Sequence, residues 1–277
     1  MSTALTPRAG RGALTAFAAL LCGCLLAAGP PGGAIGGVAA ARASEEVALH
    51  ASFSPDRLGA STTIGFGFHI VNTAGGLPSP LTHVDLRMPP NMNYITSSLG
   101  LATCRPQRLV EDGLTGCPAN SRLGFGSAFV EVPFGQNAGQ EIPEIQALMG
   151  PPRNGNVVVL FYANGLEPVF AQIVFEGELV GGSGSFGEDL AAKIPEIKSV
   201  TGGPPVSIVE VNSTIGPSHL LYTKHVHGRL VHYRPQGVAL PGKCPHGGFP
   251  FAADFTFLDG SNVVAKTTVP CPRRSKK

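Results

Sequence analysis

The sequence predicts an all-β protein, built as an antiparallel β-sandwich. Three observations lead to this class. Short segments alternate apolar and polar residues, Gly and Pro are abundant (37 and 25 of 277 residues), and four of the six cysteines follow the N-terminal region. Dense turn residues are typical of many short strands rather than of helices joined by loops. We expect either one elaborated sandwich or two small modules, stapled by disulfides.

The alternation has a period of two in several segments. Ile64, Phe66, Phe68 and Ile70 alternate with small or polar residues, as in a half-buried strand. Further strand-sized segments are residues 82–88, 157–163, 169–175, 206–211 and 220–227. Near the C-terminus, a row of four phenylalanines precedes Asp259 and Gly260 and a second alternating segment, which predicts a hairpin that buries Phe249, Phe251, Phe255 and Phe257.

The best position for a domain boundary is the segment 136–156, which is rich in Pro, Gly and Asn. A boundary here predicts an N-terminal β module at residues 44–140 and a C-terminal β module at residues 141–271. Residues 272–277 form a basic tail, for which we expect a solvated, frayed terminus.

The N-terminal region predicts export. Arg8 and Arg11 precede an apolar run from Ala13 to Ala28, and the segment that follows ends in small residues around Ala43. This order is typical of a secretory signal peptide at residues 1–43. The apolar run is shorter than the roughly 20 residues that cross a bilayer, so we expect no transmembrane helix in the mature chain. Lipidation at Cys24 is the alternative, because residues 21–24 loosely match a bacterial lipobox.

The charge of the mature chain excludes one class of partner. The whole chain has 20 Lys and Arg against 18 Asp and Glu, and residues 1–43 hold three of the arginines and no acid. The remaining chain is therefore close to neutral, without the clustered basic face that binds nucleic acid. We expect no nucleic-acid partner.

The mature cysteines are Cys104, Cys117, Cys244 and Cys271. An even number in an exported chain predicts disulfides. Three pairings are possible, and sequence proximity favours Cys104 with Cys117 and Cys244 with Cys271. A zinc site would need cysteines two to four residues apart, which this set does not contain.

Two patterns suggest ligand binding, and each has a simpler explanation. His225 and His227 would share one face of a strand and could hold a metal, although an exposed polar pair is the more common origin of such spacing. Residues 182–187 satisfy GxGxxG before a short helix expected at residues 188–194. Pro195 cuts that helix short and no βαβ unit follows, so we interpret the glycines as a loop and expect no cofactor.

Neither the GxSxG elbow nor the HExxH motif occurs, and the carboxylates are mostly single. We therefore favour a non-enzymatic protein and leave the catalytic residues unassigned. Separated carboxylates can still meet in a fold.

Several segments together resemble a group of exported, β-rich actinobacterial proteins of unknown function. They are Ser52 to Pro55, Leu77 to Pro80, Cys117 to Gly126, and the closing hairpin framed by Cys244 and Cys271. The resemblance implies turns and disulfides and assigns no catalytic residue. Our first hypothesis is a non-enzymatic extracellular or cell-envelope protein whose loops or strand edges bind a partner. The alternative is a secreted carbohydrate-active or other hydrolase whose site is not visible in the sequence.

Overall fold

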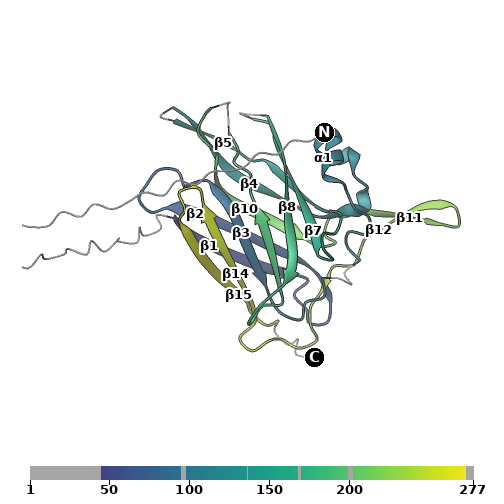
Figure 1. Cartoon of the computed structure of the whole chain (residues 1–277). Helices are drawn as coiled ribbons and strands as arrows, with labels where there is room; N and C mark the ends of the chain where they lie inside the picture. Colours follow the sequence, from purple (N-terminus) through teal and green to yellow (C-terminus); the bar gives the residue numbers. More distant parts are fainter. Residues whose placement is uncertain (1–44, 95–97, 136, 168–169, 199–201, 273–277) are drawn as a thin grey trace, which may run out of the picture. The chain divides into compact units, whose positions relative to one another are not determined.

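One antiparallel sheet dominates the computed structural model, which describes residues 45–94, 98–135, 137–167, 170–198 and 202–272 (Figure 1). Eleven strands follow one another in the order β1-β2-β10-β4-β6-β7-β8-β9-β3-β14-β15, while β5 pairs with β4 and β13 pairs with β2. The strands of this sheet are β1 (Glu45–Ser54), β2 (Ser61–Asn72), β3 (Leu81–Met88), β4 (Arg122–Phe134), β5 (Asn137–Glu141), β6 (Glu144–Met149), β7 (Val157–Gly165), β8 (Ala171–Gly181), β9 (Glu188–Lys193), β10 (Ser207–Ile215), β13 (Val238–Ala239), β14 (Phe249–Phe257) and β15 (Asn262–Val269).

The two ends of this sheet meet. β1 and β15 end the strand order, yet they lie against each other, so the sheet is nearly closed into a barrel. The all-β antiparallel prediction is confirmed, but the strands form one curled sheet rather than a clear sandwich. The physical reason is that a half-buried strand alternates with the same period whether its apolar face meets a second sheet or the far side of a barrel.

Strands from both halves of the sequence pair with one another. β10 lies between β2 and β4, and β3 lies between β9 and β14. The segment 136–156, where we placed a boundary, contributes β5 and β6 to the sheet. The interior is therefore lined by residues from both predicted modules.

The phenylalanine row lies in the core, as the sequence predicts. Phe249, Phe251 and Phe255 on β14 are at most 1% exposed, and β14 pairs with β15 through the predicted turn. Rings from the N-terminal strands pack edge-on against this row. The ring centroids of Phe53 and Phe249 lie 5.1 Å apart, and those of Phe68 and Phe255 lie 5.0 Å apart. Such aromatic pairs add to the free energy gained by burial.

A short helix covers part of the outer face of the barrel. In α1 (Pro106–Asp112), Leu109 is fully buried in a cluster with Leu148 and Leu160 of β6 and β7. The loop closed by the disulfide Cys104–Cys117 contains this helix and a 3-10 turn at Gly113–Gly116. A second 3-10 turn, Ala119–Ser121, follows Cys117 and leads into β4. The second disulfide, Cys244–Cys271, joins the segments that flank the β14–β15 hairpin.

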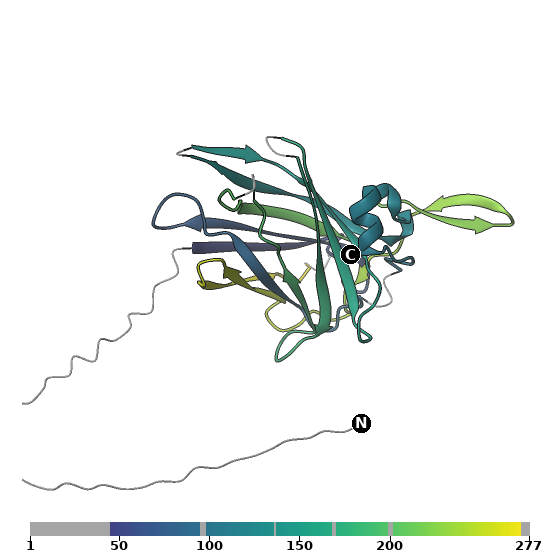
Figure 2. The same cartoon turned by 45° about the horizontal axis from the view of Figure 1, so that its top comes forward.

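A separate two-stranded hairpin projects from the barrel (Figures 1 and 2). It consists of β11 (Tyr222–Val226) and β12 (Arg229–Tyr233), which pair only with each other in the described part of the chain. Within that part, no helix has the length and apolar character needed to cross a membrane.

Candidate functional site

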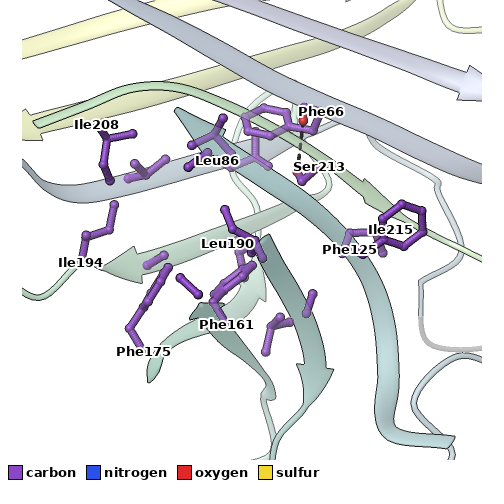
Figure 3. Close-up of a pocket in the computed structure, with 18 of the residues that line it drawn as sticks. Phe66, Leu86, Phe125, Phe161, Phe175, Leu190, Ile194, Ile208, Ser213 and Ile215 are labelled. Atoms are coloured by element: carbon purple, nitrogen blue, oxygen red, sulfur yellow. Dashed lines mark hydrogen bonds between the residues drawn. The ribbon is translucent and has the colours of Figure 1, made fainter. Parts of the chain in front are cut away.

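A cavity of about 350 Å³ lies inside the barrel. Figure 3 shows its wall, where Phe66, Phe161, Phe175, Leu190 and Ile208 point toward a common space from different strands. Nearly all other lining residues are also apolar. The cavity falls within the size range of ordinary small-molecule sites.

The interior is hollow because the barrel is wide and several of its inward positions are small. Barrels of about eight strands are just filled by their own side chains or hold one small ligand, and the diameter grows with strand number. Here eleven strands enclose the interior, and alanines occupy positions on neighbouring strands, including Ala147, Ala163, Ala171 and Ala192. As a result, Phe66, Phe161 and Phe175 face inward but remain only half-buried.

One end of the barrel is filled by side chains. Met92, Leu99 and Val238 are buried there, and Tyr222 is completely buried. The hydroxyl of Tyr222 donates a hydrogen bond to the carbonyl of Arg122 and accepts one from the amide of Gly100 at 2.9 Å. These bonds satisfy the only polar group of a buried ring and hold that ring in place at this end.

The opposite end is the mouth of the cavity, which we define by Glu141, Pro143, Ala171 and Lys198. Lys198 lines the cavity and is itself exposed, so the cavity reaches solvent at this point. The connection from β9 to β10 crosses this end, because β9 and β10 lie on different sides of the barrel. Its described residues Ile194, Ile197 and Val206 add to the apolar lining.

Glu141 is the only acid that lines the cavity in the described part of the chain. It is 7% exposed, and its Oε1 has no hydrogen-bond partner there. Burial raises the pKa of this carboxyl, while the backbone amides of Leu166 and Glu167 hydrogen-bond to it and act in the opposite direction.

The backbone leaves a space that the carboxyl group of Glu141 occupies. It lies over Gly165 at the end of β7, where even a single Cβ atom would collide with Oε1. Ser213 and Thr214 also line the cavity, but their hydroxyls donate to the carbonyls of Phe66 and Phe125 at 3.0 and 3.1 Å. Glu141 Oε1 therefore differs from these groups in having an unused hydrogen-bonding position.

A second group of carboxylates lies on the outer face of the barrel. Asp254 on β14 and Asp85 on β3 are directly paired, and Arg87 bonds to Asp254. Burial is the main cause that raises the pKa of Asp189 on β9; Arg87 lowers it, and the two other aspartates raise it. This group does not face the cavity, because it alternates with lining residues such as Val84, Leu86 and Leu190.

The residues predicted from the sequence as a metal site lie elsewhere. His225 is on β11 and His227 follows in the turn of the projecting hairpin; both are exposed. No group of three potential metal-ligating side chains occurs among the described residues. The metal site stays a prediction.

The GxGxxG segment at residues 182–187 forms the turn between β8 and β9. The residues after it form the strand β9, so the short helix expected there is wrong; pairing with β3 and β8 overrides the local helical pattern. The predicted signal peptide, the alternative lipidation site Cys24 and most of the basic tail lie outside the described residues.

Comparison of the chain with protein-family models, with curated proteins and with solved structures finds no match. The cavity is therefore the feature of the molecule that indicates a function. Sequence reasoning missed the cavity, because its lining carries no motif. The available signal was the repeated occurrence of Ala and Gly at inward positions of strands.

Proposed function

We propose that this is an exported binding protein that holds a small apolar molecule inside its barrel and carries out no reaction on it. The observation that carries the proposal is the cavity of about 350 Å³, whose wall is formed by half-buried phenylalanine, leucine and isoleucine side chains. Apolar cavities readily accept apolar ligands. A ligand would cover the surface that these side chains leave exposed.

The distribution of carboxylates supports binding rather than hydrolysis. Glycoside hydrolysis usually needs two carboxyl groups on either side of the scissile bond. Glu141 stands alone in the described lining of the cavity, while Asp85 and Asp254 face outward, where Asp254 pairs with Arg87 and Asp85 bonds to His83.

Location outside the cytoplasm belongs to the same proposal. The two disulfides indicate an oxidising environment. The N-terminal sequence pattern supports export to the cell envelope or the medium. An apolar molecule in such a place needs a carrier, because it is poorly soluble in water.

The test is binding of the neutral apolar fluorophore N-phenyl-1-naphthylamine to the purified mature protein. We expect saturable fluorescence enhancement, and loss of binding in Ala163→Phe, since Ala163 lines the cavity. Ala191→Phe is the matched control, because Ala191 alternates with the lining residues Leu190 and Ala192 and faces outward.

Native mass spectrometry of protein purified from its source would also show any retained ligand. Absence of saturable binding by the wild-type protein would refute the proposal. Equal loss of binding in Ala163→Phe and Ala191→Phe would also refute it, because the fluorophore would then not report on the cavity.

A further inference from the structure

We propose that the ligand of the barrel carries a hydrogen-bond donor, a hydroxyl or an ammonium group, at one end of an apolar body, and that Glu141 receives this donor at the mouth. This inference rests on the proposed function. It names the chemistry of the ligand and the residue that orients it.

The position of Glu141 carries this inference. Glu141 is only 7% exposed, and its Oε1 has no partner in the described structure. Buried polar atoms are nearly always hydrogen-bonded, so an unused carboxylate oxygen on the wall of a cavity indicates a partner that enters with the ligand. Gly165 leaves the space that the carboxylate occupies.

The surroundings of Glu141 select the class of ligand. A carboxylate accepts hydrogen bonds and repels anions, so a ligand that ends in a carboxylate or phosphate fits poorly beside Glu141. Lys198, the cation of the described lining, is paired with Glu196 at 3.3 Å. Beyond Glu141 the cavity continues through Ile145, Ala163 and Ile173, which offer no polar partner. The ligand therefore has one polar end at the mouth and an apolar remainder in the barrel.

The experiment compares three probes of equal chain length in displacing N-phenyl-1-naphthylamine: 1-decanol, decylamine and 1-methoxydecane, which has no donor. We expect the wild-type protein to bind the two donors about tenfold more tightly than the ether, as expected for a hydrogen bond to a charged acceptor. Glu141→Leu removes the acceptor and should bring all three affinities together. Glu141→Gln keeps an acceptor oxygen without the charge, so it should retain the preference for decanol and lose that for decylamine.

Glu144→Leu is the control, because Glu144 is exposed and precedes the lining residue Ile145 on β6. It should bind all three probes as the wild type does. Equal binding of ether and donors by the wild type would overturn the role of Glu141, as would a donor preference that survives in Glu141→Leu. Failure of the fluorophore itself to bind would instead overturn the proposed function, so the two failures are distinguishable.

A different observation carries a second proposal: the β11–β12 hairpin is a docking element for an anionic lipid surface. The chain contains no Asp or Glu between Glu210 and Asp254, whereas the hairpin carries Lys224 and Arg229 together with His225. Figure 2 shows the hairpin projecting away from the barrel, and Lys224 and Arg229 on it are both exposed.

Apolar residues of the hairpin point to lipid rather than to a soluble anion. Val226 and Val231 share a face of the hairpin with Lys224 and Arg229, and they are 37% and 38% exposed. Leu230, on the opposite face, is 56% exposed. Basic side chains beside exposed valines match a membrane surface, where the charges meet lipid headgroups and the apolar groups enter the boundary below them.

Sedimentation with vesicles tests this proposal. The wild-type protein should bind vesicles that contain phosphatidylglycerol and not pure phosphatidylcholine vesicles. Each basic residue near an anionic surface contributes about fivefold in affinity, so Lys224→Gln with Arg229→Gln should weaken binding on the order of twentyfold. The control pair Lys243→Gln and Lys266→Gln, exposed and outside the hairpin, should change it little. Equal binding to both vesicles, or a loss no larger than that of the control pair, would overturn the proposal.

Discussion

Replacing Glu141 by Gln should stabilise the ligand-free protein at neutral pH. The carboxylate is 7% exposed and one of its oxygens lacks a partner in the described structure. A buried polar group without its hydrogen bond costs about 1–3 kcal/mol, and more when the group is charged. Gln keeps the shape of the side chain and removes the charge.

The size of the effect follows from two opposing contributions. Burial disfavours the carboxylate, and the amides of Leu166 and Glu167 recover part of this cost by hydrogen bonding. We therefore expect a net gain of about 1 kcal/mol, at the lower end of the range for such groups. In a unit of this size, residues 41–277, that gain raises Tm by about 2–4 °C.

The gain should depend on pH in a defined direction. The pKa of Glu141 is raised above its usual value of 4.5 in the folded protein, so the folded state binds this proton more tightly than the unfolded chain does. Stability of the wild type therefore rises as the pH falls through the folded pKa toward the usual value. Glu188 and Asp189, whose pKa values are also raised, affect both proteins alike.

Thermal unfolding of both proteins at pH 7 and near pH 5, without ligand, measures this difference. The advantage of Glu141→Gln should be largest at pH 7 and should shrink at pH 5. A variant that is less stable than the wild type at pH 7 would refute the reasoning, because Glu141 would then have a partner that the structure does not show. A difference that grows on acidification would refute the assigned direction of the pKa.

Three further predictions concern stability and use denaturant unfolding. Replacing Cys104 and Cys117 together by Ser should cost about 3 kcal/mol, since the bond closes a loop over a separation of 13 residues; no loss would contradict the stapling role. Phe255→Ala should cost about 3–5 kcal/mol, because this fully buried ring fills the core beside Phe68, and a cost below 1 kcal/mol would show that the site collapses. Gly165→Ala should destabilise the wild type, and should do so less when Glu141 is already Ala, because the new Cβ collides with the Glu141 carboxyl group; equal losses in both backgrounds would exclude that collision.

The local elements could be predicted from the sequence because their signals are local. Alternation at Ile64, Phe66 and Phe68 predicts β2, and the phenylalanine row with Asp259 and Gly260 predicts the β14–β15 hairpin. The two disulfides join the cysteines that lie closest in sequence among the described residues. These features depend on neighbours within a few tens of residues.

Closure of the sheet could not be predicted in the same way. β10 pairs with β2 and β4 over large separations in sequence, and β1, the first described strand, lies against β15, the last. An inward-facing residue such as Phe66 gives the same alternating pattern in a sandwich and in a barrel. The choice between them depends on the number of strands and their stagger, which no single strand encodes.

The position of Glu141 shows the same limit for the site. In the sequence, Glu141 is one acid in a segment that also contains Pro143 and Glu144, a composition typical of a turn. Its burial arises only when β5 returns beside β4, and the end of β7 supplies Gly165 beneath the carboxylate. A charged residue placed in this way lowers the stability of the empty protein, and a ligand that donates a hydrogen bond would recover the loss. The stability cost and the ligand preference are therefore two measurements of the same buried carboxylate. Glu141→Leu should remove both, whereas Glu141→Gln should reduce the cost and lose the preference for decylamine while it keeps that for decanol.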